Sequence, residues 1–300
     1  MTRRSVLTAL AVALLSVMVL SGLVLAVVFA ARGNSGFVLG GRIAVLTIDG
    51  VISDDTELLE QIREFRDDAS IRGFVVAINS PGGSVGPSQS IYHELKRLRD
   101  EDGRPVIASI GGVGASGGYY VALGADSIFA MPGSLTGSIG VIMEFPDASE
   151  LMDKVGVRMQ VVKSAEHKDI GSPFRPITAG DSAILGALVQ DVYQQFVDVV
   201  ATERRLDRGA VQSLADGRIL SGRQALDQRL IDRLGNFEDA LSAAGRMAGL
   251  GDRPRMTRPP EKSFTLWDVL LGRGVEGALG RLIGPLEKVS VPNVKLMIPW

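Results

Sequence analysis

The sequence contains no cysteine, and this absence excludes disulfide bonds, a catalytic thiol and thiolate zinc sites. Histidine is scarce as well: only His93 and His167 are present, so an imidazole-rich metal site is excluded and a Ser-His-Asp triad has two candidate bases. An excess of one charge is also missing, because 32 basic residues nearly balance 34 acidic ones and leave a net charge of -2. Such a balance creates no general field that would attract nucleic acid. The composition therefore argues against a protein that binds nucleic acid.

A long uncharged apolar run, residues 6–31, lies near the N-terminus, with Arg3 and Arg4 before it. A helix of this length reaches about 39 Å, against a hydrocarbon core of about 30 Å, so we expect a membrane-spanning anchor. A cleavable signal peptide is the alternative, but its apolar region is usually about 7 to 15 residues long, and Phe29-Ala30-Ala31 matches a cleavage site only weakly. The two arginines predict a cytoplasmic N-terminus, which places the remainder of this single-pass chain outside the cytoplasm.

Apolar, strand-like segments alternate with amphipathic helical segments after the anchor. The expected strands are residues 43–49, 73–78, 105–110, 125–130 and 157–163, and the expected helices are residues 57–65, 88–99, 119–123 and 179–203. This alternation predicts an α/β fold with a mainly parallel sheet flanked by helices. We divide the chain into residues 1–41 (cytoplasmic N-terminus, anchor and linker), 42–250 (the α/β domain) and 251–300 (a Pro-rich linker and an apolar tail). The last segment, Lys295–Trp300, is apolar enough to enter an apolar groove.

Two glycine-rich turns follow predicted strands. In the first, Asn79-Ser-Pro-Gly-Gly-Ser84, adjacent glycines let the backbone amide of Gly83 approach a ligand and point at an oxyanion. In the second, Ser116 lies among glycines at the start of a predicted helix, where the amide of Gly117 is a second candidate donor. An ordinary strand-to-helix turn and a simple helix N-cap are the structural alternatives for these two segments.

The surroundings of Ser116 also match the G-x-S-x-G elbow of α/β-hydrolases, in which His167 would be the base. The short stretch between the two residues leaves little room for the strands and acid loop which that fold requires. Lys168 is the other candidate base, because a lysine can replace histidine where burial lowers its pKa. A solvated surface lysine is the alternative for this residue.

Five segments taken together resemble the signal peptide peptidase A family, in its short form with one catalytic domain. They are residues 79–84, 114–120, 135–140, 167–173 and 216–218. The resemblance implies a Clp protease/crotonase-like fold built from repeated ββα units. It also implies that Ser116 is the nucleophile, that Lys168 is the general base, and that Ser138 orients the lysine. By the same resemblance Gly83 supplies an oxyanion amide, and no cofactor or metal is required.

The resemblance further implies a serine endopeptidase with a Ser-Lys dyad that degrades remnant signal peptides and similar apolar peptides beside membrane lipid. Members of this family form homo-oligomers, with an octamer expected for the short form, and the serine and lysine of one site can come from neighbouring protomers. Two alternatives from other classes stay open. One is a crotonase-like acyl-CoA enzyme, which would use carboxylate bases, and the other is a catalytically inactive membrane scaffold.

Overall fold

The computed structural model describes residues 16–22, 40–259 and 295–296. The chain separates into two units, residues 1–40 and 41–300. Within the first unit, residues 16–22 are helical, and the rest of the predicted anchor lies outside the described residues. Among the described residues, none of the helices has the length and apolarity needed to cross a bilayer.

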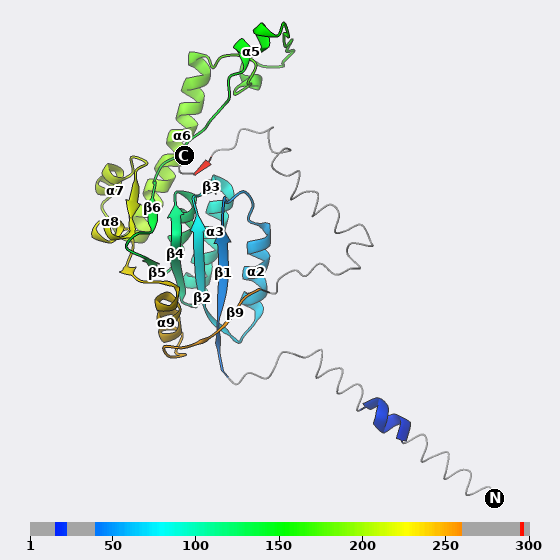
Figure 1. Cartoon of the computed structure of the whole chain (residues 1–300), viewed down its shortest axis with the longest axis vertical. Helices are drawn as coiled ribbons and strands as arrows, with labels where there is room; N and C mark the ends of the chain where they lie inside the picture. The colour runs from blue at the N-terminus through cyan, green and yellow to red at the C-terminus, as the bar shows by residue number, and fades with distance from the viewer. Residues whose placement is uncertain (1–15, 23–39, 260–294, 297–300) are drawn as a thin grey trace, which may run out of the picture. The chain divides into compact units, whose positions relative to one another are not determined.

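Three long parallel strands form the centre of the second unit (Figure 1). They are β1 (Arg42–Asp49), β2 (Ile71–Ser80) and β4 (Val106–Ala115), and β2 lies between the other two. Val75 of β2 pairs with Val45 on one side and with Ile107 on the other. All three side chains are almost completely buried, as expected for a parallel sheet covered on both faces. The predicted strands at residues 43–49, 73–78 and 105–110 are confirmed.

Shorter strands extend this sheet on both sides. They are β5 (Ser127–Ala130), β6 (Leu135–Gly137), β7 (Ile219–Ser221), β8 (Arg233–Leu234) and β9 (Arg255–Thr257). β6 pairs with the last residues of β4, and only its pairing with β7 is antiparallel among the pairings described for this sheet. β9 pairs with β1, so the sheet continues beyond residue 250. The predicted α/β class with a mainly parallel sheet is confirmed.

Helices cover both faces of the sheet. α2 (Thr56–Asp67), α3 (Val85–Asp100) and α4 (Gly117–Ala122) pack on one face, and α9 (Phe237–Met247) packs on the other. The two faces use alternate strand residues: Leu46 belongs to the core under α2 and α3, whereas Ile43 belongs to the core under α9. This division follows from the two-residue repeat of a strand. The two short helices α7 (Arg208–Leu214) and α8 (Gly222–Asp227) complete this part of the fold.

Residues 149–178, here called the arm, connect the sheet to the long helix α6 (Ala179–Arg204). The arm contains α5 (Ser149–Lys154) and one turn of 3-10 helix, η1 (Glu166–Asp169). The prediction of α6 is confirmed, but the strand expected at residues 157–163 is wrong, because this segment has no regular secondary structure. A strand needs a hydrogen-bonded neighbour, and the pairings described for this chain include none with this segment. Its apolar side chains are instead exposed, among them Val157, Met159 and Val161.

A second sheet of two strands is formed beside the end of β2, with its own hydrogen-bond pairing. β10 (Lys295–Leu296) pairs antiparallel with β3 (Gly83–Ser84), so that Leu296 is opposite Gly83. The other residues of the predicted tail after residue 259 lie outside the described residues. β3, which lies in the first glycine-rich turn, therefore has an edge that can pair with another extended segment.

Candidate active site

Ser116 connects the end of β4 to the start of α4, in a backbone conformation that serine rarely adopts. Its φ is 52° and its ψ is -116°. The backbone N–H of Ser116 donates to the carbonyl oxygen of Gly137 at 2.8 Å, and its carbonyl accepts from Tyr120 at the same distance. These two hydrogen bonds hold a conformation that costs on the order of 1–3 kcal/mol. Strain of this kind at a strand-to-helix turn is characteristic of a nucleophile elbow.

The hydroxyl of Ser116 is buried but has no hydrogen-bond partner. The residue is 1% exposed, and its Oγ is one of the few buried side-chain atoms without a partner in the described part of the chain. Leaving a buried hydroxyl unpaired costs about 1–3 kcal/mol, so native structures rarely retain one without a functional reason. Strain and an unpaired hydroxyl coincide at the residue that the sequence predicts to be the nucleophile.

Gly83 and Gly117 lie against one another beside Ser116. A Cβ added to Gly117 would be 3.1 Å from the backbone nitrogen of Gly83 and 2.6 Å from the Ser88 hydroxyl. Gly83 is equally confined, because a Cβ there would be 2.0 Å from the carbonyl oxygen of Ile52. Only glycine fits at either position, which is the requirement for two backbone amides to approach one atom closely.

The amides of these two glycines face away from the backbone that packs against their own segments, and the amide of Gly83 faces the edge of β3 on which β10 pairs. Ile52 bonds to the carbonyl of Gly82 and to the N–H of Ser84, so the intervening amide of Gly83 faces the opposite side. The N–H of Gly117 belongs to the first residue of α4, where the helix provides no acceptor. The structure thus brings together the two predicted oxyanion donors.

Ser138 is a second buried serine with positive φ, here 50°. Its N–H donates to the carbonyl of Arg218 at 2.9 Å, and the residue before it, Gly137, accepts the hydrogen bond from Ser116. Ser138 also lines a cavity of about 460 Å³ together with Val141, Val189 and other residues. The structure therefore places Ser138 next to the Ser116 turn and at the wall of a largely apolar cavity.

Lys168 is not brought to Ser116 within one chain. It lies on η1 in the arm, its side chain is exposed, and its ammonium makes no hydrogen bond or ion pair with the described residues. His167 is also away from the Ser116 hydroxyl, which has no partner, and its Nδ1 lies 3.5 Å from Oδ1 of Asp181. The contact between Ser116 and Lys168 stays a prediction. No group of three or more His, Asp or Glu side chains in the described ranges is arranged to hold a metal ion.

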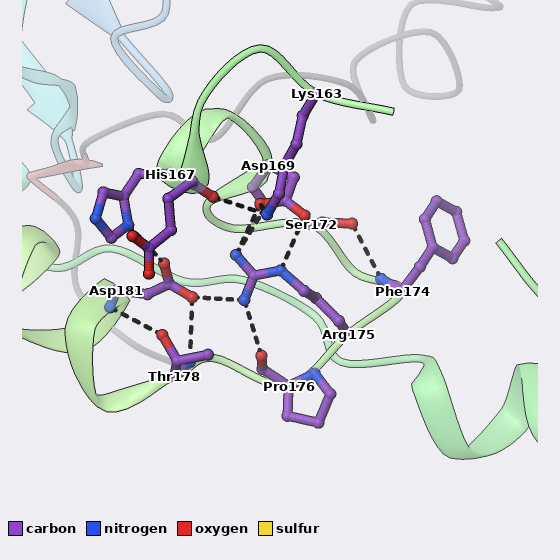
Figure 2. Close-up of polar contacts among 10 residues, drawn as sticks. Lys163, His167, Asp169, Ser172, Phe174, Arg175, Pro176, Thr178 and Asp181 are labelled. Carbon is purple, nitrogen blue, oxygen red and sulfur yellow. Dashed lines mark hydrogen bonds and ion pairs between the residues drawn. The ribbon is translucent and has the colours of Figure 1, made fainter. Parts of the chain in front are cut away.

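A polar network that the sequence analysis missed includes the two chain neighbours of Lys168, His167 and Asp169 (Figure 2). Arg175 connects Asp169, which follows Lys168, to Asp181 in the first turn of α6. The hydrogen bonds from Arg175 lower the pKa of both carboxyl groups well below their ordinary range. The sequence carried one signal for this network: Thr178 and Asp181 have the spacing of a capping box, and the structure contains that box.

Comparison with known proteins identifies the chain. The model of peptidase family S49 matches residues 99–251. A protein of Synechocystis sp. that is named as a protease is 42% identical over 211 residues, which cover 70% of this chain and 75% of the relative. The chain belongs to peptidase family S49. A second relative, from Enterococcus faecium, is named as a signal peptide peptidase SppA and is 35% identical over 224 residues, covering 70% of this chain and 65% of its own length. A third, named as a protease of Methanocaldococcus jannaschii, is 34% identical over 225 residues, or 74% and 72% of the two chains.

Membership of S49 makes this protein a serine peptidase, a hydrolase that acts on peptides. The resemblance to the signal peptide peptidase family that the sequence motifs indicated is confirmed. The matched S49 region contains Ser116, Ser138 and Lys168, whereas Gly83 precedes it. A catalytic serine is therefore required, and Ser116 has the geometry of one.

Proposed function

We propose that this S49 peptidase cleaves peptide bonds with a dyad of Ser116 and Lys168, and that its substrates are remnant signal peptides and similar apolar peptides at a membrane. The observation that carries the proposal is the Ser116 hydroxyl itself. It is buried, unpaired and held on a strained turn, next to the confined amides of Gly83 and Gly117. An acyl-transfer nucleophile requires such an arrangement.

The proposed reaction proceeds through an acyl-enzyme. Neutral Lys168 takes the proton of Ser116 while Oγ bonds to the carbonyl carbon of the peptide, and the amides of Gly83 and Gly117 hold the resulting oxyanion. The ammonium of Lys168 then protonates the leaving amine as the C–N bond breaks. Water, losing a proton to Lys168, attacks the ester carbon. The ammonium of Lys168 then returns that proton to Oγ of Ser116 as the C–O bond breaks and the peptide leaves as a carboxylic acid. Ser138 would orient the lysine during both steps.

A second copy of the chain would bring Lys168 to Ser116. A lysine that acts as a base must be desolvated, and Lys168 is exposed within one chain, so something must cover it. The arm presents exposed apolar side chains around η1: Leu151, Val155, Val157, Met159, Val161, Val162 and Phe174. A patch of this kind is typical of a surface that meets another protein. We propose a homo-oligomer, an octamer by family resemblance, whose sites combine residues of neighbouring protomers.

The proposed substrate class is supported by the surroundings of Ser116. The edge of β3 beside Gly83 accepts β10 as an antiparallel strand, which is how an extended peptide would bind. The cavity at Ser138 has a mainly apolar lining and could hold an apolar side chain. The uncharged run at residues 6–31 supports a single-pass anchor with a cytoplasmic N-terminus and an extracytoplasmic catalytic domain. The strand order is consistent with a Clp protease/crotonase-like fold.

The test uses the full-length chain and a serine-directed fluorophosphonate together with an apolar peptide substrate. We expect that S116A and K168A each lose peptide cleavage and that mixing the two inactive chains during assembly restores part of it, because each contributes the residue that the other lacks. Retained cleavage by K168A would disprove the dyad. Failure of the wild-type chain to react with the probe or cleave the peptide would favour an inactive scaffold or an acyl-CoA enzyme.

A further inference from the structure

Lys168 lies in η1 between His167 and Asp169. His167 contacts Asp181 at the N-terminus of α6 directly, and Asp169 is connected to Asp181 through Arg175 (Figure 2). On one side, Asp169 receives hydrogen bonds from Arg175 and from Lys163, whose ammonium is 2.8 Å from Oδ1. On the other side, Nδ1 of His167 lies 3.5 Å from Oδ1 of Asp181. Lys168 itself takes no part in the network, so its neighbours are fixed while its amine stays free to react.

Arg175 is the central residue of this network. Its Nε and Nη2 contact the two carboxylate oxygens of Asp169 at 3.1 and 3.0 Å, and its Nη1 donates to Oδ2 of Asp181. Nη1 also donates to the carbonyl of Pro176 at 3.1 Å. A planar guanidinium can make these contacts at the same time. A lysine ammonium has one nitrogen, so it cannot bind one carboxylate through two nitrogens and also bond to a second carboxylate.

Asp181 connects this network to the helix. Its side chain is 3% exposed, accepts from the N–H of Thr178 at 3.1 Å, and forms the capping box of α6. The opposite half of α6 is anchored in the core through Phe196, Val197 and Val200. Arg175 therefore connects the turn that carries Lys168 to α6, and α6 is itself packed in the core of the main fold.

We propose that Arg175 is a positioning residue for Lys168: by bridging Asp169 and Asp181 it fixes the direction in which the lysine amine leaves η1. This inference rests on the proposed function, because it assumes that Lys168 is the base. Nothing in the network contacts Ser116, so Arg175 acts through the lysine alone.

The experiment measures the rate at which the fluorophosphonate labels Ser116 as a function of pH, in the full-length assembled chain. Labelling should rise with pH as Lys168 loses its proton, and K168A should lose this rise. Arg175→Lys keeps the positive charge but cannot bridge both carboxylates. We expect it to reduce labelling near neutral pH by about ten- to a hundred-fold, since misplacement of about 1 Å can cost that much. We also expect the midpoint of the rise to move to higher pH, because a misplaced lysine is less desolvated.

Two further variants make the outcome decisive. Asp169→Asn breaks the same bridge from the other side and should reproduce the shift of the midpoint, while Arg158→Lys, at an exposed arginine of the arm, should behave as wild type. An unchanged midpoint in both Arg175→Lys and Asp169→Asn would overturn the proposal, even if the maximal rate fell, because a merely structural role lowers the amount of active site without changing its titration. Retention of the rise by K168A would instead overturn the proposed dyad, and the positioning role with it.

Discussion

At the residue scale, Ser116 and Ser138 share a positive φ that the sequence alone does not reveal. The glycine-rich motifs predicted which serines to examine, because small neighbours are visible in the sequence. They did not predict that both serines have positive φ or that the Ser116 hydroxyl is unpaired, since these properties depend on hydrogen bonds to Gly137 and Arg218 from distant segments. The role of Arg175 was not predicted for a similar reason. The sequence shows an arginine near a capping box, but not which carboxylates that arginine contacts.

The strain at Ser116 predicts that glycine at this position gives a more stable chain than alanine does, although neither residue can supply the nucleophile. Both S116G and S116A should be inactive, but S116G should unfold with a free energy about 1 kcal/mol higher than that of S116A. The reason is that glycine adopts a φ of 52° without steric cost, which outweighs its larger loss of chain entropy. Denaturant unfolding of the two variants measures the difference.

The control for this prediction is Ser109 in β4, a buried serine without positive φ. There the order should reverse, with glycine about 0.5–1 kcal/mol less stable than alanine. An S116G chain no more stable than S116A would show that the turn stores no strain.

At the scale of elements, the long strands and helices were predictable, and so were the short strand β5 and the short helix α4, whereas the strands of two or three residues were not. Residues 43–49 are long enough to show the continuous apolar run of a buried strand, and residues 179–203 show the apolar repeat of a helix over several turns. Both segments form the expected elements. β8 and β9 have two and three residues, too few to show a repeat. Residues 157–163 show the opposite problem, because they have the alternation of a strand but pair with no strand in the described part of the chain.

The attachment of α6 to α3 depends on Glu203. Its carboxylate accepts from Tyr92 at 2.7 Å and from Arg99 at 2.9 Å, and it lies 3.1 Å from the ammonium of Lys96. Burial alone would raise the pKa of Glu203, but the hydrogen bonds from Tyr92 and Lys96 and the charge of Arg99 lower it below its ordinary value of 4.5. The carboxylate therefore contributes stability above that pH and loses the contribution as the pH falls through the lower pKa of the folded state.

Glu203→Gln should accordingly reduce the free energy of unfolding at pH 7 by about 1–2 kcal/mol, because charged hydrogen bonds become neutral ones. The difference from wild type should shrink as the pH falls below 4.5, where the wild-type carboxylate itself becomes protonated. Glu101→Gln is the matched control, since Glu101 is 65% exposed and its nearest arginine nitrogen is 3.6 Å away. Thermal unfolding of both variants at several pH values checks the prediction, and a difference that persists at low pH would contradict it.

At the scale of the whole molecule, the C-terminal strand lies where a substrate should bind. β10 pairs with β3 opposite Gly83, the residue whose amide we propose to hold the oxyanion. The sequence showed that the terminal segment is apolar, but not which edge it meets, because a two-residue pairing leaves no pattern. The domain boundaries predicted at residues 41 and 250 and the membrane anchor stay predictions.

A chain that ends at residue 259 should bind an apolar peptide more tightly than the full chain. Removing β10 frees the edge of β3, and one or two backbone hydrogen bonds of about 0.5–1.5 kcal/mol each correspond to a fall in KM of about three- to tenfold, with kcat unchanged. Leu296→Pro in the full chain should have the same effect, since proline disrupts strand pairing. Equal KM values for all three chains would mean that β10 does not compete with substrate.

The edge of β3 restricts the backbone conformation of any peptide that binds to it. Its main-chain groups can bond only to a chain whose own N–H and C=O groups are free, and a helix satisfies these groups internally. Under the proposed function, a helical substrate peptide must therefore lose its helical hydrogen bonds locally before its scissile bond can reach Ser116. Under that condition, helix propensity around the cleavage point, more than apolarity, would decide which peptides are cut first.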